Sequence, residues 1–577
     1  MSNCVEHIFL FACMLMLAPA NAQFISRQRA IDVASVFMHE DSNTDILLAS
    51  GNRNANIVEF VDDSQTCFYG VGIDNSWVFV SADERVQPIL GVIRQSQEIP
   101  SLDNMPPAMK DLFGWYTEEI RYIQDSVKTV ARHPQWEYYI NSKSARVINE
   151  SRNTGVPNLL EIEEGDVIRW GQDFNSDPIT ILGKEFNRLC PTFHNVFYGH
   201  NVTGCVATAI GQIMKYWQWP YSAIVPTEMC DTLGHTSGAT LHEYDWTKMP
   251  SQLHNSTPDE EVLEVAGLLR DVGYAVNMEY RCDGSYVFLS AIYDTLKTKF
   301  RYASSIAYHK KGLNWVNRLK SEIDAGRPII YDAWRKDSTN NKHGHAFILS
   351  GYDTANRFYV NWGVRKPFTM FDGFFLLDSL HTYNTPDYYY RYDHAAIFGI
   401  QPDYPSCGDY VMLDNDISPD LFEIYRGGKI LGLSKTIPAN KSGVIYSGES
   451  IILRPPFKIK RGAKVHMAIK DMHCGQAQMN SPRRLYVPLS NNVNIGRDNS
   501  QSLLKEVFSV SPNPVSSILH INTSDELSQA KIYTINGQCV LQASQTDIDV
   551  SSLPQGMYIL RAMTADGQEH QAKFIKQ

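Results

Sequence analysis

The chain lacks several features that mark common classes of protein. It has no Cys-x-x-Cys pair, so neither a zinc site nor a dense disulfide framework is indicated. It lacks a basic excess, since 52 Lys and Arg stand against 63 Asp and Glu, and the net charge of −11 argues against a nucleic-acid binder. Beyond the N-terminus, it has no apolar run long enough to cross a bilayer. We therefore expect no metal, no other cofactor, no nucleic-acid partner and no membrane span.

The N-terminus has the pattern of an export signal. An apolar run, too short to span a membrane, ends at the small-x-small sequence Ala20-Asn21-Ala22. The six residues before the run carry no Lys or Arg, which departs from the usual pattern. We predict that residues 1–22 are a signal peptide and that the protein is exported.

Length and composition predict several domains, because 577 residues exceed what one hydrophobic core supports. Residues 23–155 combine two amphipathic helices with a hairpin and end in a polar, basic stretch that suits either a processing site or a plain linker. Residues 156–402 have helices first and antiparallel-looking strands afterwards, which indicates an α+β domain. Short strands with turn residues predict a β-sandwich module and linker over 403–502 and a second small β-sandwich over 503–577.

One cysteine stands where a thiol becomes reactive. Gly204 and Cys205 immediately precede an apolar stripe with helical spacing that runs to Trp217. Cys205 would then lie in the first turn of a helix, where free N–H groups and the helix dipole favour the thiolate, the nucleophilic form. A buried structural cysteine is the alternative for this stretch alone.

Further along the chain lie partners that such a thiol needs for peptide hydrolysis. His345 opens an apolar strand and is a candidate base. Asn361 follows sixteen residues later at the end of the next strand, where its amide oxygen could accept the ring N–H of His345. Taken alone, His345 could be a surface residue at a strand end and Asn361 a strand-to-turn residue.

Other residues complete the candidate site. Gln172 could join the backbone N–H of Cys205 as an oxyanion donor. Trp362 would shield the expected bond between asparagine and histidine from water. We expect Trp362, Gly344 and Ser285 to contact a substrate.

The order Gln–Cys–His–Asn is that of papain-like thiol proteases, and the chain resembles the streptopain family more specifically. The resemblance rests on five separated blocks that recur in order over about residues 165–401: Thr203–Tyr216, Asp271–Tyr280, Gly344–Phe347, Tyr359–Gly363 and Asp372–Phe375. It implies a papain-like catalytic domain of two subdomains at 156–402, with catalytic Cys205, His345 and Asn361 and an oxyanion-binding Gln172. It also implies a secreted endopeptidase that acts on proteins or peptides and is inhibited by its own propeptide, residues 23–155. One departure is the stretch Val364–Phe371, which replaces a glycine-rich loop of the family and leaves substrate preference open.

The C-terminal block resembles another known domain. Residues 508–576 carry, in order, the four strand signatures of the C-terminal sorting domain of the type IX secretion system of Bacteroidetes bacteria. The resemblance implies export through the periplasm to the medium or the outer cell surface, with the type IX machinery as a partner.

Two other functions remain open at this stage. A catalytically silent surface adhesin or inhibitor on the same fold would suit the altered loop and the β-modules. A cell-wall amidase or a transglutaminase-like enzyme would use the same nucleophile. A self-inhibited cysteine endopeptidase is the favoured interpretation.

Overall fold

The computed structural model divides the chain into two compact units, Met1–Leu485 and Tyr486–Gln577. The expected signal peptide, residues 142–154 of the polar link and most of the loop 364–371 lie outside the residues that it describes. Those described are 24–42, 55–96, 100–101, 105–126, 131–141, 155–163, 165–172, 186–192, 200–254, 256–281, 284–336, 342–364, 371–378, 392–408, 411–413, 419–433, 435–472, 509–511, 515–522, 527–534, 538–564 and 569–577. Within these ranges, no helix combines the length and the apolarity that crossing a membrane requires.

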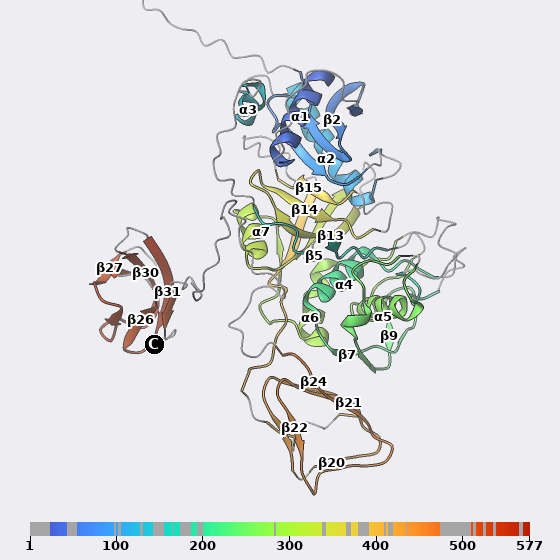
Figure 1. The fold of residues 1–577 in the computed structure, drawn as a ribbon, viewed down its shortest axis with the longest axis vertical. Coiled ribbons are helices and arrows are strands. Elements are labelled where there is room, and N and C mark those ends of the chain that lie inside the picture. The colour runs from blue at the N-terminus through green and yellow to red at the C-terminus, as the bar shows by residue number, and fades with distance from the viewer. Residues whose placement is uncertain are drawn as a thin grey trace, which may run out of the picture. The chain divides into compact units, whose positions relative to one another are not determined.

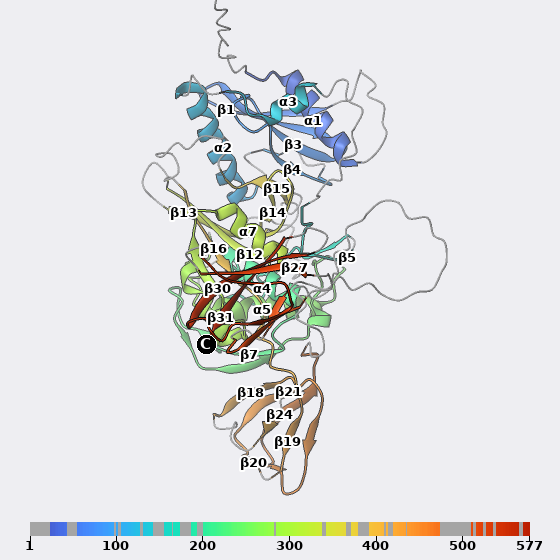
Figure 2. The same cartoon turned by 90° about the vertical axis from the view of Figure 1, so that its left-hand side faces the viewer.

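The N-terminal part of the first unit is an antiparallel meander with a helix on each side. Buried aromatic residues of α2, such as Phe113 and Tyr116, cover one face of the strands, and α1 covers the other face with Val33 and Ala34. Figure 2 shows α1 and α2 on opposite sides of these strands. The elements are α1 (Arg27–Ser42), β1 (Asn56–Asp62), β2 (Gln65–Ile73), β3 (Ser76–Ser81), β4 (Ile89–Ile93), α2 (Pro107–Ser126) and α3 (Gln135–Asn141).

The central part confirms the predicted order of helices followed by antiparallel strands. Its first half packs α4 against α5 around an apolar core that includes Ile210, Ile213 and Leu269 (Figure 1). Its second half is a sheet whose strands β12 and β13 are buried on both faces. The elements are β5 (Glu161–Glu163), β6 (Asp166–Val167), α4 (Cys205–Trp217), β7 (Ser222–Val225), β8 (Glu228–Met229), β9 (Thr236–Ser237), β10 (Thr240–Glu243), the short 3-10 helices η2 (Trp246–Lys248) and η3 (Leu289–Ala291), α5 (Asp259–Ala275), α6 (Tyr293–Phe300), β11 (Ala307–Lys310), α7 (Trp315–Asp324), β12 (Ile329–Lys336), β13 (Lys342–Tyr352), β14 (Arg357–Asn361), β15 (Gly373–Leu376) and β16 (Tyr392–Phe398).

One sheet runs through both parts. Its ten strands follow the order β1-β2-β3-β4-β15-β14-β13-β12-β16-β11, and all neighbours are antiparallel. The junction is the β4–β15 pair, in which Gly91 lies opposite Phe375 and Ile93 opposite Gly373. The N-terminal part is therefore joined to the central sheet by backbone hydrogen bonds as well as by side chains.

The prediction of a β-sandwich over 403–502 is wrong for the residues that the structure describes there. Three small sheets form, with orders β17-β19-β22, β18-β21-β24 and β20-β23, and every pair in them is parallel. Each strand pairs with its counterpart about 21 residues later, as in a β-solenoid, whereas the strands of a sandwich pair antiparallel. We call the strands β17 to β24, within residues 411–469, the solenoid. Apolar alternation marks the faces of a strand but not its direction, so the pattern alone did not distinguish the two folds. The strands are β17 (Val411–Met412), β18 (Leu421–Arg426), β19 (Ile430–Gly432), β20 (Thr436–Ile437), β21 (Ser442–Ser447), β22 (Ile451–Leu453), β23 (Lys458–Ile459) and β24 (Lys464–Ile469).

The solenoid contacts the helical half of the central part through tyrosines and charged groups. The Tyr446 hydroxyl donates to Glu243 (2.5 Å), which also pairs with His466. The guanidinium of Arg301 lies 4.4 Å from the ring centre of Tyr425. We call this contact the solenoid seam.

The second unit is a small antiparallel β-sandwich. Its two sheets have the orders β25-β26-β29 and β28-β27-β30-β31, and they enclose a core that includes Leu519, Ile532, Leu560 and Phe574. The strands are β25 (Ser509–Ser511), β26 (Ile518–Asn522), β27 (Leu527–Thr534), β28 (Cys539–Ala543), β29 (Asp547–Asp549), β30 (Gly556–Thr564) and β31 (Glu569–Lys576).

Candidate active site

The thiol of Cys205 lies at the first residue of helix α4. Gly204 precedes it with φ of +88°, a left-handed conformation that favours glycine. A Cβ at Gly204 would also come within 2.9 Å of the Ser285 carbonyl oxygen. Cys205 is a half-buried free thiol, and its Sγ accepts the backbone N–H of Ala346 at 3.4 Å. The turn thus directs the start of the helix at strand β13.

His345 comes to the same place from strand β13. Its Nε2 lies 3.4 Å from the carbonyl oxygen of Trp362. On strand β12, the residue opposite His345 is Ala333, and Asp332 lies opposite Ala346. The fold therefore brings Cys205 and His345 together across 140 positions of the sequence.

The thiol and the imidazole shift each other's pKa in opposite directions. Burial acts to raise the pKa of Cys205, but the charge and hydrogen bond of His345, with the Ala346 N–H, outweigh burial and bring this pKa below its ordinary value. Burial acts to lower the pKa of His345, but the Cys205 charge and hydrogen bond, the Trp362 carbonyl and the carboxylate of Asp111 raise it above its ordinary value. The arrangement favours a thiolate–imidazolium pair.

Asn361 does not lie where we expected it. The register of β13 and β14 pairs it with Ile348, three residues beyond His345. Its Oδ1 accepts the backbone N–H of Gly363 (3.0 Å) and Nε2 of Gln212 (3.2 Å). The ring of His345 contacts the carbonyl of Trp362 instead of the expected amide oxygen.

Gln172 lies beside the same turn. It is buried, its backbone N–H donates to the Gly363 carbonyl (3.2 Å), and it forms an isolated bridge with Val364. Its role as an oxyanion donor remains a prediction.

The three candidate substrate contacts have different surroundings. Trp362 is fully buried and its indole donates to the Phe371 carbonyl (2.9 Å), so in this state it is a core residue. Ser285 is also buried, and its hydroxyl donates to the Val202 carbonyl (2.6 Å). Gly344 is exposed on β13. Only Gly344 presents surface to a ligand here, whereas Ser285 supports the turn before Cys205.

Sequence reasoning missed two buried polar residues of the site. Asp332 is buried opposite Ala346, and its charge opposes the lowering of the Cys205 pKa. Gln212 is fully buried in α4 and bonds Asn361. Gln212 could have been noticed because it lies seven residues after Cys205, on the same side of the helix.

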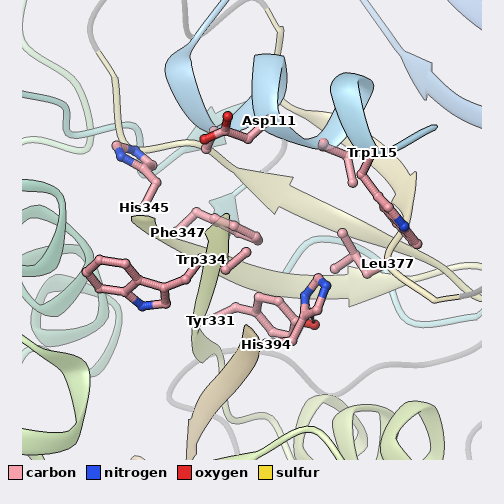
Figure 3. Close-up of a pocket in the computed structure, with 11 residues that line it drawn as sticks. Asp111, Trp115, Tyr331, Trp334, His345, Phe347, Leu377 and His394 are labelled. Atoms are coloured by element: carbon pink, nitrogen blue, oxygen red, sulfur yellow. Dashed lines mark hydrogen bonds between the residues drawn. The ribbon is translucent and has the colours of Figure 1, made fainter. Parts of the chain in front are cut away.

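Helix α2 closes the site on the histidine side. A narrow cavity lies between α2 and the central sheet. Figure 3 shows Asp111 of α2 and His345 close together at one end, with Trp115, Leu377 and His394 at the other. The lining residues are Ala108, Asp111, Leu112, Trp115, Tyr331, Ala333, Trp334, His345, Phe347, Leu377 and His394.

Within the described ranges, His, Cys, Asp and Glu side chains form no group of three or more that could hold a metal ion. The site chemistry that the described side chains support is that of a thiol and an imidazole.

Three family models match separate parts of the chain. Residues 22–120 match the Spi protease inhibitor, residues 182–375 the Peptidase C10 family and residues 509–577 the secretion system C-terminal sorting domain. The chain therefore contains an inhibitor domain, a peptidase domain and a sorting domain, in that order.

Individual proteins are also similar to this chain. The thiol protease/hemagglutinin PrtT of Porphyromonas gingivalis is 27% identical over 409 residues, which cover 68% of this chain and 43% of that protein. Streptopain of Streptococcus pyogenes serotype M1 is 28% identical over 221 residues, which cover 34% of this chain and 53% of that protein. The chain thus spans about half the length of these two relatives.

Two solved structures from Prevotella intermedia are similar as well. A prointerpain A fragment is 23% identical, with a TM-score of 0.41, over 60% of this chain and 98% of that one. Active interpain A is 24% identical, with a TM-score of 0.33, over 44% of this chain and 99% of that one.

Proposed function

Because the chain carries a peptidase C10 domain between an inhibitor domain and a secretion sorting domain, we propose that it is a secreted cysteine endopeptidase made as a self-inhibited zymogen. The observation that carries the proposal is the Cys205–His345 pair, whose pKa values shift in the directions that form a thiolate and an imidazolium. A buried structural cysteine would show the opposite shift, as Cys67 does, since burial raises the pKa of that thiol to about 12.

The reaction would proceed in two halves. The Cys205 thiolate attacks the carbonyl carbon of the scissile bond, and the C–N bond breaks as His345 gives its proton to the departing amine. Water then attacks the resulting thioester while His345 takes its proton, and the acid and the thiol are released. The Cys205 N–H and the Gln172 side chain would stabilise the oxyanion in both halves. The Trp362 carbonyl accepts the Nε2–H of His345, so Nδ1 is the ring nitrogen that would exchange the proton with the thiol.

The N-terminal domain has the contacts expected of an intramolecular inhibitor. Helix α2 places Ala108, Asp111 and Leu112 along the cavity that also contains His345. Asp111 adds a negative charge near the imidazole. A peptide substrate and α2 cannot occupy this side of the site together, so propeptide removal would be required for activity.

The sorting domain indicates export. The finer localisation that we propose is the medium or the outer cell surface, reached through the periplasm and the type IX machinery. The substrates that we propose are proteins or peptides.

The direct test replaces the nucleophile. Cys205→Ala in the full-length chain should abolish casein hydrolysis and stop loss of the propeptide, measured by fluorescence and by gel mobility. Cys230→Ala is the matched control, because Cys230 is also a free thiol but is exposed. We expect this control to keep both activities.

A surface adhesin on the same fold would give a different result. An epoxide inhibitor of thiol proteases should label Cys205 after propeptide removal, and mass spectrometry of the peptide 203–215 would detect it. Continued self-processing by Cys205→Ala, or failure of the processed wild-type chain to take the label, would rule out the proposal.

A further inference from the structure

Gln212 lies in an unusual place for a polar side chain. It is in α4, seven residues after Cys205, so both lie on the same side of the helix two turns apart. Its neighbours Ile210, Ile213 and Met214 are buried apolar residues, and Gln212 itself is 0% exposed. A buried carboxamide is costly unless its hydrogen bonds are made.

All the hydrogen bonds of this carboxamide that the structure gives run to the active-site segments. Its Oε1 accepts the Trp170 N–H (3.1 Å) and Nδ2 of Asn361 (3.0 Å). Its Nε2 donates to Oδ1 of Asn361 (3.2 Å). Gln212 and Asn361 thus form a reciprocal pair of two hydrogen bonds between α4 and the end of β14.

This pair leaves Asn361 with no capacity for the imidazole. A carboxamide offers two donor hydrogens and an oxygen with two lone pairs. The donors of Asn361 go to Gln212 and to the Ile168 carbonyl (3.1 Å), and its oxygen accepts from Gln212 and from the Gly363 N–H (3.0 Å). Asn361 therefore acts on His345 through another group.

That group is the peptide between Trp362 and Gly363. The Gly363 N–H, bonded to Asn361, and the Trp362 carbonyl, 3.4 Å from Nε2 of His345, belong to one planar peptide. Fixing the N–H of a planar trans peptide fixes the direction of its C=O. Gly363 permits the turn because its φ is +65°.

We propose that Gln212 is a positioning residue for His345, acting through Asn361 and the Trp362–Gly363 peptide. The inference rests on the proposed function, since it gives Gln212 a role in the thiol–imidazole reaction. Gln212 also bonds Trp170, two residues before Gln172. One carboxamide thus ties the nucleophile helix, the expected oxyanion segment and the acceptor of the imidazole to one another.

Two variants of the full-length chain test the role. Gln212→Leu removes every hydrogen bond of the carboxamide, and we expect kcat of the self-processed enzyme to fall about 10-fold to 100-fold with KM within about twofold. Gln212→Glu keeps the shape but presents a carboxylate oxygen to Oδ1 of Asn361. Its kcat relative to wild type should rise as the pH falls, because a protonated carboxyl can donate to that oxygen again.

The matched control is Tyr216→Phe. Tyr216 is in the same helix, is buried, and donates to the Gly326 carbonyl (2.9 Å) away from the site. We expect it to lower the melting temperature without changing the pH profile. If Tyr216→Phe lowers kcat as much as Gln212→Leu does, Gln212 affects catalysis only by stabilising the helix, and the positioning role is wrong.

A second readout does not depend on peptide hydrolysis. The rate at which iodoacetamide alkylates Cys205, followed by mass spectrometry as a function of pH, reports the thiolate and therefore the orientation of its imidazole. We expect Gln212→Leu to shift this profile to higher pH. The inference would be overturned if Gln212→Leu kept the wild-type kcat and an unshifted alkylation profile. It would also be overturned if the kcat of Gln212→Glu relative to wild type did not change with pH. An inactive wild-type chain would overturn the proposed function instead, and the alkylation profile would still decide the role of Gln212.

Discussion

The peptidase domain carries two attached domains, and they are attached in different ways. The N-terminal domain continues the central sheet through the pairing of β4 with β15. Buried aromatic residues of α2 also pack against the same sheet. The solenoid forms no shared sheet with the peptidase domain within the described ranges. It meets the helical half through buried aromatic side chains, among them Tyr425 and Tyr446, and through tyrosine hydroxyls and charged groups.

The difference predicts how each attachment responds to a substitution. Pairing between β4 and β15 brings two backbones together, so one extra carbon atom in the junction affects the whole pair. The solenoid seam combines buried aromatic packing, in which Tyr425 and Tyr446 join the core that contains Trp219, with polar contacts at its exposed edge, so the loss of one edge contact leaves the others. We expect release of the N-terminal domain to be all-or-none and weakening of the solenoid seam to be gradual.

The largest effect is expected at the shared sheet. A Cβ at Gly91 would lie 2.6 Å from the Phe375 ring and 3.0 Å from the Phe374 carbonyl oxygen, both in the peptidase domain. We expect Gly91→Ala to weaken propeptide binding by about 1–3 kcal/mol. Since about 1.4 kcal/mol is a factor of ten, basal activity of the unprocessed chain should rise about fivefold to 150-fold.

The control for this prediction is Gly267→Ala. A Cβ at Gly267 would meet nothing closer than Leu189 at 3.9 Å. Hydrolysis of a fluorogenic peptide before processing measures both variants. Equal basal activity in Gly91→Ala and wild type would mean that the shared sheet does not hold the inhibitor.

An intermediate effect is expected from pH. His394 lines the cavity under α2, where burial and the charge of Lys311 lower its pKa from 6.5 to about 3. Removal of α2 would expose the ring and return its pKa toward 6.5, so the docked state favours the neutral form. Propeptide binding should therefore be strongest above pH 6.5 and weaken as the pH falls from there toward 3, by up to about tenfold for each pH unit.

Replacement of the ring tests this sign. His394→Gln keeps a polar group near the Tyr331 hydroxyl, which lies 2.9 Å from Nδ1 of His394. We expect the variant to lose much of the increase in propeptide release between pH 7 and pH 5, measured by gel filtration of a Cys205→Ala chain nicked between the domains. An unchanged pH dependence would assign the effect to another group.

The smallest effect is expected at the solenoid seam. Glu243→Gln removes the ion pair with His466 but keeps an oxygen for the Tyr446 hydroxyl. Both charged partners are well exposed, so we expect the free energy of unfolding to change by less than about 1 kcal/mol. Thermal unfolding measures it. A decrease of the free energy of unfolding by about 1–3 kcal/mol, the size expected for propeptide binding in Gly91→Ala, would show that the two attachments do not differ in this way.

Much of the site could be predicted from the sequence because its chemistry is local. The glycine before Cys205 and the apolar stripe after it fix both the start of α4 and the place of the thiol. His345 at the start of an apolar strand was likewise predicted as the partner, and the structure brings the two together.

The contacts around Asn361 could not be predicted in the same way. They depend on the register between β13 and β14, which places Asn361 opposite Ile348, and on a glutamine of a distant helix. Spacing along the chain predicts neither the register nor this contact. Instead of bonding the imidazole, Asn361 bonds the Gly363 N–H, and the Trp362 carbonyl of the same peptide contacts the imidazole.

The N-terminal and solenoid domains show the same limit at the level of the fold. The predicted hairpin of this domain corresponds to β2 and β3, but nothing in the sequence identifies β15 as the neighbour of β4. Strand direction in the solenoid is set by contacts about 21 residues apart, whereas alternation reports only neighbouring residues.

The solenoid's construction has a consequence for how this protein can change over time. Each coil pairs with the coil beside it, as Leu421, Ser442 and Lys464 stack in sequence along one face. Duplication or loss of one coil of about 21 residues would alter the height of the stack by about 4.8 Å and leave the remaining rungs intact. Length is thus a property that this domain can gain or lose in whole steps.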